Sequence, residues 1–353
     1  MIKLLREVVF HSIKMILKDK ILLLLTFIVI NLSYSQEMVF NSQPKLMHVS
    51  NPSYFGLNSW NRSGLLYNTT EINPNETQNN KFFYGSYSFD LLDFSLGVQF
   101  NNFNAPNIGY KKNDLNLSYI YKVELGNDLW FLPSVNVGFV SKNLNPSNLI
   151  FEDQINSITG YINQESIDPL ADFFFAKNYT DLGASFLVHS TDFLIGINFD
   201  YLNQPNVAYD TDVEFLVPIS YGMQVAYEFN LNPYDRRFLP RYSYLYAYTS
   251  VRRDSESINI FSSQEFQLGE FSVGANQQFG LFDNFSFLNL GLSVGLTYEN
   301  FDFGVSYAFS IQDLTTSYRY PPRIFDLYLS FDFSPFLRNR RGQYKRLQVD
   351  NYY

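Results

Sequence analysis

The sequence predicts an all-β fold, a transmembrane antiparallel β-barrel of about 14 strands with an N-terminal leader and a short basic C-terminal tail. Three observations predict it. Apolar and polar residues alternate along most of the chain, which sends them to opposite faces of a strand. The non-apolar face consists mainly of Gly, Ser, Asn, Asp and Gln, which are small enough for a confined lumen. The connections between strands are unequal in length, as in outer-membrane barrels.

The composition favours strands over membrane-spanning helices. Of the 353 residues, 46% are hydrophobic and 18% aromatic, while only 17% are charged. The mean hydropathy of -0.14 is too low for a bundle of membrane helices. The net charge of -9 argues against a nucleic-acid partner, because contacts to phosphates need a basic face.

Residues 1–35 are predicted to be a secretory signal peptide. Lys14, Lys18 and Lys20 precede the apolar run 21–30, and small residues stand at the -3 and -1 positions of Ser33-Tyr34-Ser35. The apolar run is too short for a helix that crosses a bilayer of about 30 Å, although an uncleaved anchor helix is the alternative. The segment therefore predicts an exported protein, and later membrane contact must be made by strands.

Residues 36–58 form a predicted leader before the first strand. Asn51-Pro52 and Gly56 interrupt regular structure, and Tyr54 and Phe55 offer an apolar anchor. The leader could dock inside the barrel as a plug or tether, or it could be disordered.

The barrel itself is predicted over residues 59–334. Its clearest strand is Leu288–Tyr298, in which even positions are apolar and odd ones are Asn, Gly, Ser or Thr. The predicted strands are 59–69, 80–90, 93–101, 114–124, 129–141, 179–189, 192–202, 214–229, 241–251, 257–268, 270–279, 287–298, 301–311 and 323–334.

The lengths of the connections favour a transmembrane barrel over a soluble sandwich. Tight turns are expected after strands 2, 4, 6, 10 and 12, and longer connections after strands 1, 3, 5, 7 and 13. The longest is residues 142–178. Short turns of such barrels face the periplasm, so an even strand count places both chain ends there. A soluble sandwich also alternates, but its wet face normally carries Lys and Glu.

A basic tail over residues 335–353 follows the last strand. Its cations are Arg338, Arg340, Arg341, Lys345 and Arg346. In the periplasm this tail could meet an acidic partner or a lipid headgroup, or it could be a solvated extension.

We expect no enzymatic activity, no cofactor and no metal site. Cys is absent, and the only histidines are His11, His48 and His189. His11 leaves with the signal, His48 precedes the first strand, and His189 lies beside a short turn at the predicted periplasmic rim, so no Ser–His–Asp constellation is expected. Phosphate-loop and dinucleotide motifs are also missing.

Several short motifs resemble the PorP/SprF family, outer-membrane proteins of type IX secretion and gliding in Bacteroidota. The run Asn51-Pro52-Ser53-Tyr54-Phe55-Gly56 is similar to a family motif after the signal, and Arg62 follows it. Asp168-Pro169 precedes a Gly-containing strand, as in the family. The resemblance implies that Asn51, Pro52, Tyr54, Phe55, Gly56, Arg62, Asp168 and Pro169 contact a partner.

The resemblance implies a non-enzymatic barrel in the Gram-negative outer membrane that contacts lipid. Such barrels support the export and surface anchoring of an adhesin with a type IX C-terminal signal domain. Periplasmic motor or secretion components are further implied partners. The alternative is a passive channel or transporter for small or hydrophobic solutes, because about 14 strands leave room for a narrow conduit.

Overall fold

The structure is a computed structural model that describes residues 40–59, 61–73, 76–126, 128–146, 149–155, 162, 166–167, 175–209, 213–234, 236–255, 257–281, 285–311, 323–333 and 347. The predicted signal peptide, residues 1–35, lies outside these residues. Among the described residues, no helix is long and apolar enough to cross a membrane.

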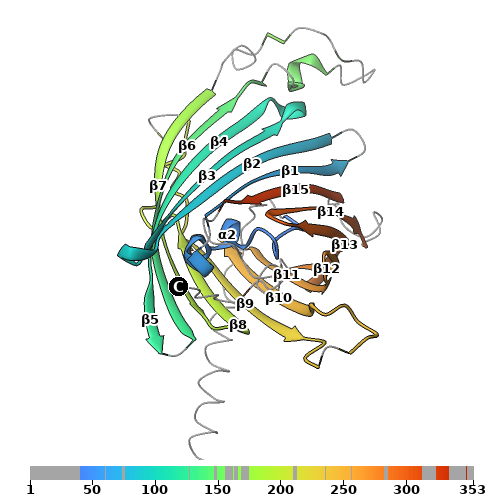
Figure 1. The fold of residues 1–353 in the computed structure, drawn as a ribbon. Coiled ribbons are helices and arrows are strands. Elements are labelled where there is room, and N and C mark those ends of the chain that lie inside the picture. The colour runs from blue at the N-terminus through green and yellow to red at the C-terminus, as the bar shows by residue number, and fades with distance from the viewer. Residues whose placement is uncertain are drawn as a thin grey trace, which may run out of the picture.

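The described chain forms one closed antiparallel β-barrel that surrounds its own N-terminal segment (Figure 1). β4 and β5 both pair with β6 and together form one wall strand. The strand is interrupted at Lys122, whose N–H donates to the Asp93 carbonyl at 2.8 Å. The wall therefore has the 14 strands that the sequence predicts. The strands are β1 Arg62–Asn73, β2 Glu76–Phe89, β3 Phe94–Ala105, β4 Tyr110–Tyr121, β5 Val123–Gly126, β6 Leu129–Leu144, β7 Phe175–His189, β8 Phe193–Asp200, β9 Ser220–Asn230, β10 Ser243–Asp254, β11 Ser257–Leu268, β12 Phe271–Leu281, β13 Phe285–Tyr298, β14 Phe301–Ser310 and β15 Arg323–Asp332.

Pairing between the first and the last strand closes the barrel. Arg62 of β1 stands opposite Asp332 of β15, and Glu71 stands opposite Arg323. We call the rim at Arg62 and Asp332 the entry end, because the chain enters and leaves the wall there, and the opposite rim the far end. Closure removes both free sheet edges, as a lipid environment requires.

Several connections differ from those that the sequence predicts. β1 and β2 continue until Asn73 stands opposite Glu76, and β3 and β4 until Ala105 stands opposite Tyr110. The connections after these strands are therefore short rather than long, because Asn- and Thr-rich stretches that resemble loops still pair as strands. The far end keeps three long connections, residues 145–174, 201–219 and 311–322.

The eighth predicted strand, 214–229, begins later, at Ser220. Residues before it pair within their own connection, since the Val207 N–H donates to the Phe215 carbonyl at 2.9 Å and Val217 to Pro205 at 3.1 Å. Pro218 supports this break because it has no N–H to donate to a neighbouring strand.

The two faces of the wall differ as the alternation predicts. Large apolar side chains point outward, for example Leu65, Val135 and Leu292 with exposed fractions of 54%, 58% and 59%. Polar side chains such as Ser95 and Asn289 point inward and are buried. The outer face is therefore suited to lipid, and the polar face lines the lumen.

Candidate functional site in the barrel lumen

Residues 40–59, which we call the docked leader, run through the lumen (Figure 1). They form a turn, the short helix α2 Met47–Ser50 and the 3-10 helix η1 Pro52–Ser59. The break between the helices is local chemistry. The Asn51 side-chain oxygen accepts from the Ser53 N–H at 2.9 Å, and Pro52 fits the first helical position because its missing N–H needs no partner.

The start of the docked leader is held by a buried carboxylate of β15. The Asn41 and Ser42 N–H groups both donate to Asp326 Oδ2 at 2.8 Å. Asn68 of β1 donates to the other oxygen, Oδ1, at 2.6 Å. Asp326 has an exposed fraction of 0%, so these donors replace the water that its charge would otherwise need.

Lys45 carries the leader's only described cation into the lumen. Its Nζ lies 3.3 Å from Glu265 Oε1 and 3.3 Å from Asp302 Oδ1. The Lys45 side chain is 8% exposed, and those of Glu265 and Asp302 are 5% and 14% exposed. One cation therefore joins β11 and β14 to the leader, and its removal would leave two buried carboxylates without their counter-ion.

Asn51 makes the corresponding contact on the other side of the lumen. Its Nδ2 donates to Gln224 Oε1 at 3.0 Å, and Gln224 Nε2 donates to Asn198 Oδ1 at 2.8 Å. Gly196 of β8 makes room for this contact, because a Cβ there would lie 2.7 Å from Asn51 Nδ2. Ser53 continues the polar contacts, with its Oγ 2.9 Å from Ser185 Oγ.

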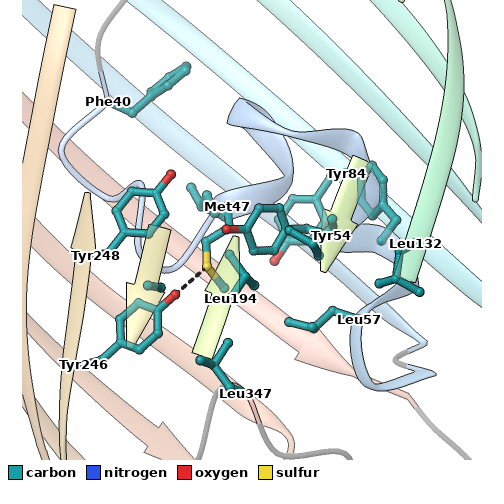
Figure 2. Close-up of a cluster of buried hydrophobic side chains, with 14 of the residues drawn as sticks. Phe40, Met47, Tyr54, Leu57, Tyr84, Leu132, Leu194, Tyr246, Tyr248 and Leu347 are labelled. Carbon is teal, nitrogen blue, oxygen red and sulfur yellow. Dashed lines mark hydrogen bonds between the residues drawn. The ribbon is translucent and has the colours of Figure 1, made fainter. Parts of the chain in front are cut away.

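An apolar cluster surrounds these polar contacts (Figure 2). Met47, Tyr54 and Leu57 lie among wall residues that include Leu132, Leu194, Tyr246 and Tyr248 (Figure 2). Tyr54 and Leu57 are 6% and 1% exposed, and the Tyr246 hydroxyl donates to Met47 Sδ at 2.8 Å. At roughly 25 cal/mol for each Å² of apolar surface removed from water, these side chains favour docking.

Two glycines allow Phe55 and its neighbour to pack closely against the wall. A Cβ on Gly97 of β3 would overlap the Phe55 ring. A Cβ on Gly56 would lie 2.7 Å from Ile120 Cγ2 of β4. Both positions need glycine for close approach rather than for an unusual backbone conformation.

His48 lies in an aromatic setting beside Arg62. Its ring centroid is 3.9 Å from that of Tyr84 and 4.9 Å from that of Phe55. Burial, assisted by the charge of Arg62, lowers the pKa of His48 to about 3, so the imidazole is neutral at physiological pH. A cavity of about 30 Å³ beside His48, Tyr84 and Arg62 is large enough for about one water molecule.

One described residue of the predicted tail also lies in the lumen. Leu347 has an exposed fraction of 0% and packs near Leu194 and Tyr246 (Figure 2). Its N–H donates to Glu228 Oε2 of β9 at 3.1 Å. At Leu347 the predicted tail is therefore packed against the wall and is not solvated.

The structure brings most of the predicted partner residues together. Asn51, Pro52, Tyr54, Phe55 and Gly56 lie in the docked leader, and Arg62 begins β1 beside His48. They are enclosed by the wall, so a role in partner binding stays a prediction. Asp168 and Pro169 lie outside the described residues.

Sequence reasoning missed the leader's main polar anchors. They are Asn41, Ser42 and Lys45, with Gln224 and Asp326 on the wall. A signal was present for Lys45, which is the only lysine between the signal peptide and Lys81 and faces inward carboxylates in a chain with few charges. No comparable signal marks Asn41 or Gln224 among so many Asn and Gln residues.

The described residues hold no group of three or more His, Cys, Asp or Glu side chains arranged for a metal ion. The polar groups around the leader serve docking, because the wall anchors pair with backbone N–H groups, amides and one lysine. The arrangement is therefore suited to holding a polypeptide segment inside a barrel.

Comparison with known proteins gives a match over most of the chain. The family model described as type IX secretion system membrane protein PorP/SprF matches residues 33–331. Curated proteins gave no match.

Similar solved structures are outer-membrane barrels. The Ralstonia pickettii toluene transporter TbuX is 9% identical, with 85% of this chain and 96% of that chain covered and a TM-score of 0.47. A mutant of the monoaromatic hydrocarbon channel TodX is 11% identical, with 83% and 94% covered and a TM-score of 0.47. An outer-membrane protein of Acinetobacter baumannii is 8% identical, with 78% and 100% covered and a TM-score of 0.43.

Proposed function

The chain belongs to the PorP/SprF family of type IX secretion system membrane proteins, and on this premise we propose that it supports the export and surface anchoring of a partner adhesin. The protein is a barrel of the outer membrane with its apolar face toward lipid. Its action in this proposal is binding without catalysis. The partner is a secreted adhesin with a type IX C-terminal signal domain, and periplasmic motor or secretion components are further partners at the entry end.

The observation that carries this proposal is the docked leader itself. Its polar atoms pair with Asp326, Glu265 and Gln224 on separate strands, while its apolar residues fill the space between them. A lumen built this way holds a polypeptide firmly by side-chain contacts from many strands. That property supports a protein-holding role more than free passage of solutes.

The leader's position also suggests how Asn51–Gly56 takes part. These residues are covered by the wall, so a partner contacts them directly only after the leader moves. Without that movement, a partner contacts only the exposed residues around the leader. We therefore assign them the role of positioning the lumen for the partner. In the proposal the partner itself meets the far-end connections, which include the predicted partner residues Asp168 and Pro169.

Gene deletion in the producing organism tests the proposal. We expect one large adhesin to disappear from the cell surface, and the intact gene to restore it. A variant lacking residues 36–58 should insert into the membrane yet restore the adhesin poorly. If every surface adhesin remains exported and attached after deletion, the proposal is wrong.

The alternative prediction, a passive channel for small or hydrophobic solutes, is tested by conductance. Single-channel recordings of the intact protein should show little current, and the variant lacking residues 36–58 should show more, because the leader occupies the lumen. High conductance of the intact protein would favour the channel instead.

A further inference from the structure

Three lysines form a row across neighbouring strands at the far end of the lumen. Lys112 of β4 stands directly opposite Lys142 of β6, which stands directly opposite Lys177 of β7. We call these three residues the lysine row. All three are half-buried, and the alternation of buried positions along their strands places them on the lumen side.

The positive charge of this row is only partly balanced. Lys112 lies 3.7 Å from Asp114 Oδ2, whereas among the described residues neither Lys142 nor Lys177 has a carboxylate within 4 Å. Like charges directly opposite each other in a sheet are destabilising. A row of three cations therefore needs a counter-charge from outside the described residues to be favourable.

Aromatic rings frame the same place. Lys142 Nζ lies 4.6 Å from the centroid of the Tyr209 ring, which belongs to the connection between β8 and β9. The Tyr209 ring lies 5.7 Å from that of Phe175, at the start of β7. These contacts hold the Lys142 ammonium group at the lumen wall, and a cation–π contact leaves it able to meet an anion.

Below the row, a strip of polar atoms without partners leads toward the docked leader. Asn136 and Asp181 are 5% and 7% exposed, and both have a buried side-chain oxygen without a hydrogen-bond partner. Asn116 Oδ1 and Ser118 Oγ are in the same condition. The strip lies between the lysine row and Ser134, where Ser53 of the leader is bound. From Ser134 to Lys142 of β6 is about 26 Å along the strand.

The chemistry of these two layers identifies a ligand class. Ammonium groups at the mouth match carboxylates, and the oxygen atoms deeper in the wall match N–H donors. A phosphate or a sugar phosphate offers no N–H groups, whereas a polypeptide with acidic side chains offers both. The carboxylates Asp114 and Asp181 lie deeper than the lysines, so they repel an acidic ligand less than the row attracts it.

We infer that the lysine row and the polar strip below it bind an acidic peptide segment of the partner in the far half of the lumen. This inference rests on the proposed function and gives the chemistry of the segment. On β6 and β7, the printed side-chain contacts of the described leader are those of Ser53 with Ser134 and Ser185, which lie nearer the entry end than the strip.

A binding experiment with the full-length protein in detergent tests the inference. The probe is a short fluorescein-labelled peptide of alternating Glu and Gly, and its control has Gln in place of Glu. We expect the acidic peptide to bind, the control peptide to bind poorly, and added salt to weaken binding.

Substitutions locate the site. Lys142→Gln and Lys177→Gln should each weaken binding about fivefold, which corresponds to one partly screened ion pair, and the triple variant with Lys112→Gln about a hundredfold. Lys111→Gln is the matched control, because Lys111 is exposed and belongs to the outward-facing positions of the same strand. It should bind as the unchanged protein does, and Lys142→Arg should retain most of the affinity.

Two outcomes overturn the inference: binding that the triple variant leaves unchanged, and displacement of the peptide by inorganic phosphate or lipopolysaccharide as effectively as by unlabelled peptide. The second would identify a phosphate site. Retention of the adhesin on cells is measured separately. If cells with the triple variant still retain the adhesin, the proposed function stands but the lysine row has no part in it. If cells with the unchanged protein do not retain the adhesin, the proposed function itself is wrong.

Discussion

The docked leader and the lysine row are two parts of one lumen with opposite electrostatics. Around the leader, the cation Lys45 lies within 3.3 Å of two carboxylates, and Asp326 accepts from backbone N–H groups. At the lysine row, three cations face one another and oxygen atoms nearby have no partner. The first region is complete by itself, and the second is complete only with a ligand. In this proposal one barrel holds its own leader and, at the lysine row, binds a segment of the partner reversibly.

Two substitutions around the leader, a change of pH and one substitution in the lysine row should separate the two regions, in decreasing order of effect. Because the chain has no Cys, a single Ser53→Cys substitution reports on leader docking. Ser53 has an exposed fraction of 0%, so a maleimide reaches a thiol there only when the leader opens. The labelling rate then measures the open fraction.

The largest effect is expected from Lys45→Met. Removing one partner of a buried ion pair costs about 3 kcal/mol. The free energy of docking should fall by this amount, so labelling of the Ser53→Cys thiol should become about a hundredfold faster. Lys111→Met is the control, because Lys111 is exposed on the outer side and should leave the rate unchanged. Equal rates for the two variants would mean that Lys45 does not hold the leader.

The second prediction concerns pH. The undocked His48 has an ordinary pKa near 6.5, and the docked one about 3, so protons bind mainly to the undocked state. Docking is therefore unaffected above pH 6.5 and weakens as the pH falls toward 3. Between pH 7 and pH 5 the open fraction should rise about 25-fold.

This pH effect is measured by labelling, corrected with an exposed thiol at Tyr234→Cys. The His48→Phe variant keeps an aromatic ring and should lose the pH dependence. If the open fraction does not change in acid, docking does not lower the pKa of His48.

The third prediction uses the glycine under Phe55. Gly97→Ala should raise the labelling rate about tenfold, because the added methyl group overlaps the Phe55 ring and overpacking costs about 1–3 kcal/mol. Gly85→Ala is the matched control on the neighbouring strand, where an added Cβ meets only Val98 Cγ1 at an ordinary 3.5 Å. If both alanines act alike, the effect comes from the wall rather than from the leader.

The smallest prediction has the opposite sign. Lys142→Gln should stabilise the ligand-free barrel by about 0.5 kcal/mol, because it relieves repulsion from Lys112 and Lys177. Urea unfolding in detergent measures this change, with Lys111→Gln as the control. A destabilised Lys142→Gln variant would contradict the view that the charge of the row is only partly balanced.

The wall was predictable from the sequence because alternation is local. Leu288–Tyr298 already separates its lipid-facing and lumen-facing residues, and β13 does place Leu292 outside and Asn289 inside. Connections were less predictable. Asn-rich stretches such as 101–104 continue as strands. Their side chains favour loops, but backbone pairing with both neighbouring strands outweighs that preference.

The lumen contacts were predictable only in part. Asn51, Tyr54 and Phe55 could be singled out from a short motif, but their wall partners could not. Asn51 meets Gln224 across 173 positions of sequence, and Asn41 meets Asp326 across 285. The lysine row is likewise invisible along the chain, because its members are brought together by register.

Local patterns along the chain are enough to predict the class of fold, the two faces of the wall and the 14 strands, because each of these depends on neighbouring residues. The tertiary structure decided which side chains meet inside the lumen. The register of each strand pair decides which inward side chains stand side by side, and closure of β1 on β15 brings the first and the last strand of the chain together. The leader's contacts with the wall and the lysine row are therefore properties of the closed barrel.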